Sequence, residues 1–268
     1  MSNTEKIQVA PGIYLSPFLA KRWPEIQKTR RPFIQIKATR SEQLTPAQSS
    51  FGHRPLLPKG FPYPMDVEGL PMFLLAQINF REVPRLAPFP ESGYLQIYIE
   101  TGDDLYGMDM EDLLEQTGFK VLFFEESELQ DPQTDFSFLD DLELDYLPLN
   151  QPFALSFTSA DDYMGPQDVR FAENFAFAAD LGELTEQLED EIGNVFPSTG
   201  HRMGGYAFFT QADPRQYDEE LSDYMLLLQI DGDEDIMWGD AGVGNFFIHP
   251  EDLARKEFSR VMYTWDCC

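Results

Sequence analysis

The chain contains 268 residues, 43% of them hydrophobic, and has a formal net charge of −28. This hydrophobic content supports a sizeable core and excludes disorder of the whole chain. The negative charge repels phosphates, so it argues against direct binding of nucleic acid or of an anionic membrane surface. Because no apolar run is long enough to cross a bilayer and the N-terminus lacks the features of a signal peptide, we expect a cytoplasmic protein.

The charges are unevenly distributed along the sequence. The first 60 residues hold ten Lys and Arg against three Glu, which is about +7 and leaves about −35 for the remainder. We therefore expect the basic N-terminal segment to lie against the acidic rest of the chain. The two cysteines, Cys267 and Cys268, are adjacent, and a pair that encloses almost no loop excludes a disulfide-stabilised scaffold.

The N-terminal third predicts one helix, one strand and one extended loop. Apolar residues recur at spacings of three and four from Leu15 to Arg30, which indicates an amphipathic helix with a kink near Pro24. Alternation of apolar and polar residues over 33–38 predicts a strand. Five prolines from Pro55 to Pro71 forbid a helix and predict an ordered, extended loop. Further strands are expected at 73–78, 93–99 and 119–124.

An acidic connection follows. Residues 100–145 hold sixteen Asp and Glu against one Lys, with leucines and aromatic residues interleaved. We interpret this segment as a partly stranded connection rather than an acidic tail. A strand is expected at 149–157, and apolar residues at helical spacing predict a helix with an acidic outer face over 181–192. The remaining strands are expected at 204–209, 224–230, 242–248 and 260–265.

The two halves of the chain share a repeat. The run Phe73-Leu-Leu-Ala-Gln-Ile-Asn79 returns 152 positions later as Met225-Leu-Leu-Leu-Gln-Ile-Asp231, and the same shift relates Gly52 to Gly204 and Pro62 to Pro214. We predict a single domain over residues 1–268 that contains two pseudo-repeats, 50–130 and 198–268. The expected fold class is α+β, mainly β, with two pseudo-equivalent halves arising by internal duplication and an N-terminal helix.

Several short motifs follow one another in a distinctive order, namely Leu57-Pro-Lys-Gly-Phe-Pro-Tyr-Pro64, Phe73 to Asn79, Gly93-Tyr-Leu-Gln, Gly204-Gly205, Gln211-Ala-Asp-Pro-Arg215, Leu227 to Asp231, Met237-Trp-Gly-Asp240 and Gly242 to Ile248. This succession resembles the YwqG-like family of bacterial proteins. The resemblance implies a roll-like, β-dominated fold of two similar halves. It implies no reaction, because that family has no assigned activity. The sequence departs from the family at Gly52-His53, where the family commonly has Gly-Gly.

The histidines and two loop segments raise the question of a metal or phosphate site. His53 and His201 lie in similar tripeptides, but these are 148 positions apart, so the repeat does not make the two histidines equivalent. The acidic segment 231–235 is not followed by the Gly and Glu of a calcium loop. The glycine-rich segment 239–244 precedes a strand rather than a helix, which argues against a phosphate loop. We predict no metal, no cofactor and no catalytic residue, because no catalytic motif is present.

A few side chains remain as candidates for ligand binding, namely Arg54, His201, Arg202, Trp238 and Asp240. The guanidinium groups, like that of Arg215, are unusual in so acidic a chain and suit an anionic ligand. The aromatic and carboxylate pair suits a pocket wall. Each candidate also has a structural interpretation, because arginines pair with nearby carboxylates and aromatic residues at strand spacing usually belong to the core.

Functions from different classes fit these observations. The leading hypothesis is a non-enzymatic binding protein whose acidic surface receives a basic protein partner, for example an intracellular immunity protein that neutralises a toxin. The alternative is an enzyme or a small-ligand receptor with a site in the cleft between the two halves, formed by the five candidate residues. A purely structural subunit is a third possibility, and the sequence leaves the oligomeric state open.

Overall fold

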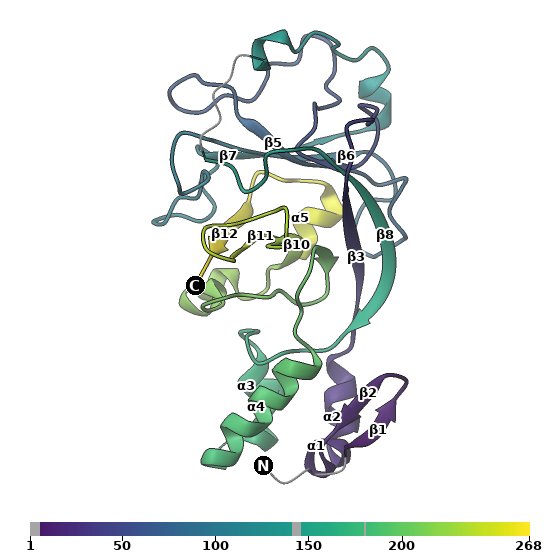
Figure 1. The fold of residues 1–268 in the computed structure, drawn as a ribbon, viewed down its shortest axis with the longest axis vertical. Coiled ribbons are helices and arrows are strands. Elements are labelled where there is room, and N and C mark those ends of the chain that lie inside the picture. The colour runs from purple at the N-terminus through teal and green to yellow at the C-terminus, as the bar shows by residue number, and fades with distance from the viewer. Residues whose placement is uncertain (1–5, 141–145, 180) are drawn as a thin grey trace.

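The computed structural model describes residues 6–140, 146–179 and 181–268, and most of it is β-structure (Figure 1). The strands are β1 (Ile7–Ala10), β2 (Ile13–Leu15), β3 (Arg31–Arg40), β4 (Ser50–Phe51), β5 (Phe73–Asn79), β6 (Tyr94–Ile99), β7 (Phe119–Phe124), β8 (Phe153–Asp162), β9 (Arg202–Gly204), β10 (Met225–Asp231), β11 (Val243–Ile248) and β12 (Val261–Asp266). The helices are α1 (Pro17–Lys21), α2 (Trp23–Ile26), α3 (Phe171–Asn174), α4 (Glu183–Val195) and α5 (Pro250–Arg255). Short 3-10 turns lie at Gln27–Thr29, Glu126–Leu129, Ser137–Leu139, Ala176–Ala178, Pro214–Tyr217 and Glu219–Leu221.

The helix expected over residues 15–30 is divided into three short pieces. Ser16 caps α1 by accepting the N–H of Leu19 at 3.5 Å. Pro24 has no N–H to donate and occupies the first turn of α2, so the chain begins a second helix there and finishes in a 3-10 turn. Within residues 100–140 there is one strand, β7, so this stretch of the acidic connection is partly stranded, as expected. Residues 141–145, which belong to the same expectation, lie outside the described residues.

Ten strands form one antiparallel sheet in the order β12-β11-β10-β9-β3-β8-β4-β5-β6-β7. The long strands β3 and β8 pair over ten residues and form a spine, from which the two flanks fold toward each other (Figure 1). The sheet nearly closes, because the ring of Phe119 in β7 lies 5.2 Å from that of Tyr263 in β12. The main hydrophobic core fills the space between the flanks.

The two flanks carry the same internal hydrogen bonds. In β5, the amide of Gln77 donates to the carbonyls of Pro46 and Gln48 and accepts the N–H of Leu56. In β10, the amide of Gln229 makes the corresponding bonds to the carbonyls of Ser198 and Gly200 and to the N–H of Phe208. Each partner pair differs by 152 positions, which is also the shift seen in the sequence.

Irregularities of the strands match in the same way. The pairing of β5 with β6 shifts register between Leu74 and Ala76, and the pairing of β10 with β11 shifts between Leu226 and Leu228. The strand that ends near Gln77 and the strand that ends near Gln229 therefore occupy corresponding places in the sheet, each third from its edge.

The helices α1–α4 and the hairpin β1-β2 form a lower module beneath the sheet (Figure 1). It has its own hydrophobic cluster, to which α4 contributes Leu188 and Ile192. None of the helices in the described parts of the chain has the length and apolar character that a membrane crossing requires.

The basic N-terminal segment lies against the acidic remainder, as its charge predicts. Five of its ten cationic side chains form ion pairs with carboxylates more than 70 positions further along the chain, namely Lys6 with Glu191, Arg30 with Asp161, Arg40 with Asp235, Arg54 with Asp140 and Lys59 with Asp131. These exposed pairs each contribute little, typically less than about 1 kcal/mol.

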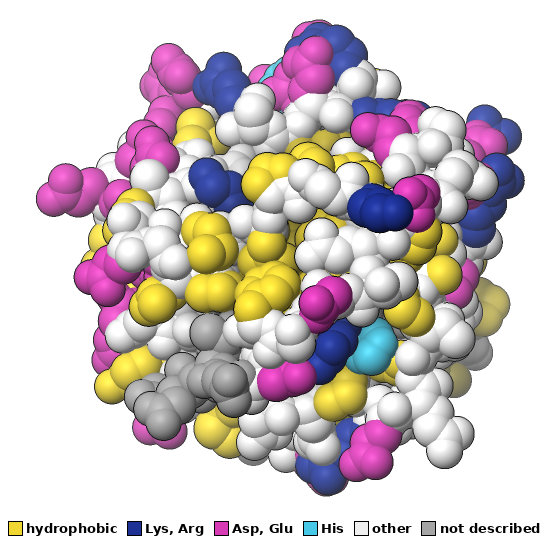
Figure 2. Space-filling view, turned by 90° about the horizontal axis from the view of Figure 1, so that it is seen from above, with side chains coloured by type: hydrophobic (Ala, Val, Ile, Leu, Met, Phe, Trp, Pro, Cys, Tyr) yellow, Lys and Arg dark blue, Asp and Glu magenta, His cyan; other side chains and the backbone are white. Residues whose placement is uncertain are grey.

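The opposite end of the molecule presents a face of mixed character. Figure 2 shows hydrophobic side chains in the middle of this face and charged groups of both signs around them. The segments above β5, β6 and β7 contain several large exposed apolar residues, including Met65, Leu70 and Phe138. This face is therefore not the acidic surface that the net charge alone suggests.

Candidate functional site

Trp238 and Asp240, expected to line a pocket, do not lie together in one. Trp238 is fully buried in the main core, where its ring packs edge-on at 5.5 Å from that of Tyr106. Gly244 in β11 allows this packing, because any side chain there would collide with the indole. Asp240 is exposed in the turn before β11. Trp238 is thus a core residue, as aromatic residues at strand spacing usually are.

The two candidate arginines are both engaged by carboxylates. Arg54 forms an ion pair with Asp140 at the surface. Arg202 is buried, and its Nη1 lies 2.6 Å from Oδ2 of Asp162. A guanidinium group that is already paired and buried has little capacity left for a ligand. The structural interpretation therefore describes both residues better than the ligand-binding one.

His201 is the candidate with a defined electrostatic environment. Its Nδ1 accepts the N–H of Asp231 at 3.0 Å, so the ring proton lies on Nε2, which faces the carboxylate of Asp233 at 3.3 Å. Burial lowers the pKa of His201, although both nearby carboxylates act to raise it. His201 and Arg54 line different hollows, so the five candidates do not converge on one pocket.

The depressed pKa of His201 predicts a pH dependence of stability. In the unfolded chain, His201 has the ordinary histidine pKa of about 6.5, so below that pH it takes up a proton that the native side chain does not bind. The free energy of unfolding therefore decreases as the pH is lowered. The position equivalent to His201 in the first half of the chain is Ser49. We expect a His201→Ser variant to lose less stability than the wild type when the pH is lowered from 7.5 to 5.5. Urea unfolding at both pH values measures the difference, and equal losses for the two proteins would contradict the assignment.

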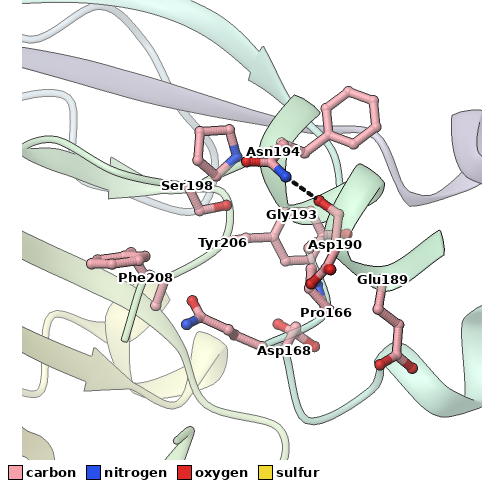
Figure 3. A pocket seen from close by; sticks show the side chains of 14 residues that line it. Pro166, Asp168, Glu189, Asp190, Gly193, Asn194, Ser198, Tyr206 and Phe208 are labelled. Atoms are coloured by element: carbon pink, nitrogen blue, oxygen red, sulfur yellow. Dashed lines mark hydrogen bonds between the residues drawn. The ribbon is translucent and has the colours of Figure 1, made fainter. Parts of the chain in front are cut away.

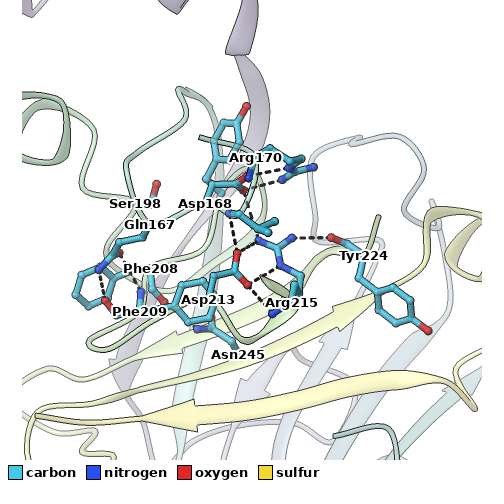
Figure 4. Close-up of polar contacts among 12 residues, drawn as sticks. Gln167, Asp168, Arg170, Ser198, Phe208, Phe209, Asp213, Arg215, Tyr224 and Asn245 are labelled. Atoms are coloured by element: carbon cyan, nitrogen blue, oxygen red, sulfur yellow. Dashed lines mark hydrogen bonds and ion pairs between the residues drawn. The ribbon is translucent and has the colours of Figure 1, made fainter. Parts of the chain in front are cut away.

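A buried ion cluster, formed by Asp168, Arg170, Asp213 and Arg215, lies beside the sheet, where Arg215 packs over Phe247 of β11 (Figure 4). The guanidinium of Arg215 donates two hydrogen bonds to the carboxylate of Asp213, the shorter from Nη2 at 2.6 Å. The same Nη2 lies 3.4 Å from Oδ2 of Asp168. Arg170 holds the other side of Asp168 at 2.6 Å. Burial raises the pKa of Asp168, but the hydrogen bonds and charges of the two arginines outweigh it and hold that pKa below its usual value.

The sequence reasoning included Arg215 among the unusual arginines but missed both carboxylates. Arg215 also donates to the carbonyl of Tyr224 at 2.7 Å, and its guanidinium lies 4.6 Å from the ring centre of Phe247. The motif Gln211-Ala-Asp-Pro-Arg215 was the available signal, since Asp213 caps the 3-10 turn that presents Arg215. No such signal pointed to Asp168, because it lies 47 positions before Arg215 in the sequence.

Next to this cluster is a cavity of about 390 Å³, here called the acidic pocket (Figure 3). Asp168 comes from the loop after β8, and Glu189 and Asp190 come from α4. Another part of the pocket wall is aromatic and consists of Phe196, Tyr206 and Phe208. Among the described residues that line this pocket there is no Lys, Arg or His.

A family model described as Domain of unknown function (DUF1963) matches residues 49–267. The chain belongs to this family. A search of curated proteins finds no relative of the chain. The matched range begins after β3, so the DUF1963 region includes both flanks of the sheet and the acidic pocket but only one strand of the spine.

In this DUF1963 protein, α4 carries an unbalanced set of charges. Its 13 residues include five carboxylates and no cationic side chain. Glu186 faces Glu189 and Asp190 at spacings of three and four, and such like-charged pairs destabilise a helix by about 0.2–0.5 kcal/mol each. Within the described residues, no group of three or more His, Cys, Asp or Glu is arranged to hold a metal ion.

Proposed function

We propose that this DUF1963 protein is a non-enzymatic binding protein of the cytoplasm, and that a basic protein partner inserts a Lys or Arg side chain into the acidic pocket. The composition of the pocket supports this most directly, because carboxylates and aromatic rings line it without any cationic residue. A cationic group held over aromatic rings gains about 0.5–2 kcal/mol in addition to its ion pairs. Neutralisation of a basic toxin is one concrete form of such binding.

Two further observations support the proposal. The carboxylates of Glu189 and Asp190 form no ion pair with any described residue, whereas Asp168 is already held by two arginines. The repulsion within α4 is relieved when a cation binds, so part of the binding energy comes from the helix itself. The five candidate residues of the alternative, a receptor or enzyme site between the halves, have no common cavity to support it.

The architecture is part of the same proposal. We infer that residues 1–268 form one YwqG-like domain with a roll-like fold, in which 50–130 and 198–268 descend from one duplicated β-module. The matching bonds of Gln77 and Gln229 support this inference. Duplicated flanks with different surroundings provide one scaffold with unlike surfaces, and residues 206–208 of the second repeat line the acidic pocket together with α4.

A cationic peptide tests the acidic pocket. We expect fluorescein-labelled octalysine to bind the full chain, with an affinity that falls as salt is added. The double variant Glu189→Gln/Asp190→Asn is expected to weaken binding by about tenfold, because it removes the two unpaired carboxylates. Fluorescence anisotropy titrations measure both effects.

The matched control is Glu111→Gln/Glu115→Gln, which removes the same charge from exposed positions outside the pocket. It is expected to weaken binding by less than about twofold. Equal weakening by both double variants would show that the peptide responds only to net charge, and an equally strong complex with octaglutamate would exclude a cation-selective pocket. Either result rejects the proposal.

A further inference from the structure

A second cavity, of about 600 Å³, opens on another side of the buried ion cluster and is here called the arginine cavity. The beginning of β3 contributes Arg31, and the loop between β5 and β6 contributes Leu86. Gly205, which follows β9, and His249, which caps α5, complete the wall. Both flanks and the spine of the sheet therefore meet at this cavity.

Arg31 is the unusual member of the wall. It is half-buried, and its guanidinium lies 4.9 Å from the ring centre of Tyr206. Within the described residues, it makes no ion pair or side-chain hydrogen bond. Burial is the main cause that lowers the pKa of Arg31, and the positive charge of Arg170 lowers it further. Among the described residues, the buried charged side chains Asp162, Asp168, Arg202, Asp213 and Arg215 all have ion-pair partners, whereas Arg31 has none.

The charges around Arg31 do not balance. The buried ion cluster contains two arginines and two aspartates, so it is neutral, and Arg31 adds one positive charge beside it. Arg170 uses Nε and Nη2 to hold Asp168, which leaves Nη1 for another acceptor. Arg31 and Arg170 both line the cavity, and their guanidinium groups offer donors that suit an oxyanion.

The remainder of the wall is compatible with such a ligand. Nδ1 of His249 accepts the N–H of Glu251 at 3.3 Å, so Nε2 is the ring nitrogen that can donate to a ligand. Two carboxylates also line the cavity. Glu251 lies 3.5 Å from Arg255, which it shares with Asp252 and Glu257. Both Glu251 and Asp223 are exposed, so water and salt screen their repulsion of an anion. The other lining residues are largely apolar, including Pro32, Leu86, Ala87, Met225 and Pro250.

We propose that the arginine cavity binds a small molecule with an apolar body and one oxyanion, either a carboxylate or a phosphate monoester, whose oxygens contact Arg31 and Arg170. The site is distinct from the acidic pocket and takes a ligand of the opposite charge. The bidentate geometry of guanidinium groups suits both oxyanions, so the test includes each.

Isothermal titration of the full chain with benzoate, phenyl phosphate and benzyl alcohol tests the site. We expect one or both anions to bind and the neutral alcohol to bind at least about tenfold more weakly. Whichever anion binds more tightly identifies the ligand class. Failure of both anions to bind at concentrations up to about 10 mM, or equal binding of the alcohol, would overturn the proposal.

Variants locate the binding. Arg31→Gln is expected to weaken anion binding by about tenfold, and Arg31→Lys by less. The control Arg30→Gln removes the same charge one residue away, at an exposed side chain that pairs with Asp161 at 2.7 Å and does not line the cavity. Equal weakening by Arg31→Gln and Arg30→Gln would overturn the assignment. In the free protein, Arg31→Gln is expected to leave the melting temperature unchanged or to raise it, because it removes an unbalanced charge, and a clear fall would assign Arg31 a structural role instead.

Discussion

Replacing Gln229 with methionine is expected to lower the free energy of unfolding by about 3–5 kcal/mol, and replacing Gln77 in the same way should cost a similar amount. Methionine nearly matches glutamine in shape but makes none of its hydrogen bonds. Each variant leaves two backbone carbonyls and one N–H without a partner, and each unpaired buried group costs about 1–3 kcal/mol. Urea denaturation monitored by tryptophan fluorescence measures both losses.

Gln130 provides the control for this pair. Its amide makes one exposed bond, to the carbonyl of Glu126 at 2.8 Å, so Gln130→Met should change stability by less than about 0.5 kcal/mol. If one of the two core variants proved nearly neutral while the other was severe, the corresponding bonds would not have corresponding roles. That outcome would contradict the prediction that Gln77 and Gln229 contribute equally to the stability of the two halves.

Replacing Arg215 with methionine is expected to cost about 3–5 kcal/mol, because it leaves Asp213 and part of Asp168 as uncompensated buried charges. The depressed pKa of Asp168 means that its pairing contributes stability at neutral pH, which is lost as the pH falls toward the native pKa. The variant has less of this contribution to lose. The gap between wild type and variant should therefore narrow as the pH falls below about 5 and through the native pKa of Asp168, as chemical denaturation at several pH values can measure.

Lys59 supplies the comparison for Arg215. It pairs with Asp131 at 3.1 Å in a fully exposed setting, so Lys59→Met should cost less than about 1 kcal/mol. A small effect of Arg215→Met, or a gap that widens in acid, would mean that the buried ion cluster is not a net source of stability. In that case its carboxylates would have to be sufficiently solvated through the two adjacent cavities.

The positions of most strands could be predicted from the sequence. Those expected at 73–78, 93–99 and 119–124 are confirmed as β5, β6 and β7, and those expected at 224–230, 242–248 and 260–265 as β10, β11 and β12. These segments are apolar on both faces and are bounded by turn residues, so local pattern determines them. The predicted extent of the N-terminal helix was wrong, because a second helix starts at Trp23, immediately before Pro24, instead of one helix continuing through a kink.

The order of the strands could not be predicted in the same way. In the β3–β8 ladder the backbone of Arg31 lies opposite that of Asp162, and no pattern within either strand specifies a partner so distant in sequence. The expected sites failed for a related reason. Whether an arginine is paired, as Arg202 is, or unpaired, as Arg31 is, depends on which carboxylates the fold brings near it.

The place of β3 in the sheet has a practical consequence. This strand lies between β8 and β9, yet it precedes residue 49, where the DUF1963 match begins. A recombinant fragment cut at the family boundary would therefore contain two half-sheets with newly exposed edges, which invite aggregation between molecules. We therefore expect the unit that folds to be larger than the region that sequence similarity recognises, and expression trials should retain the residues from the start of β3 onward.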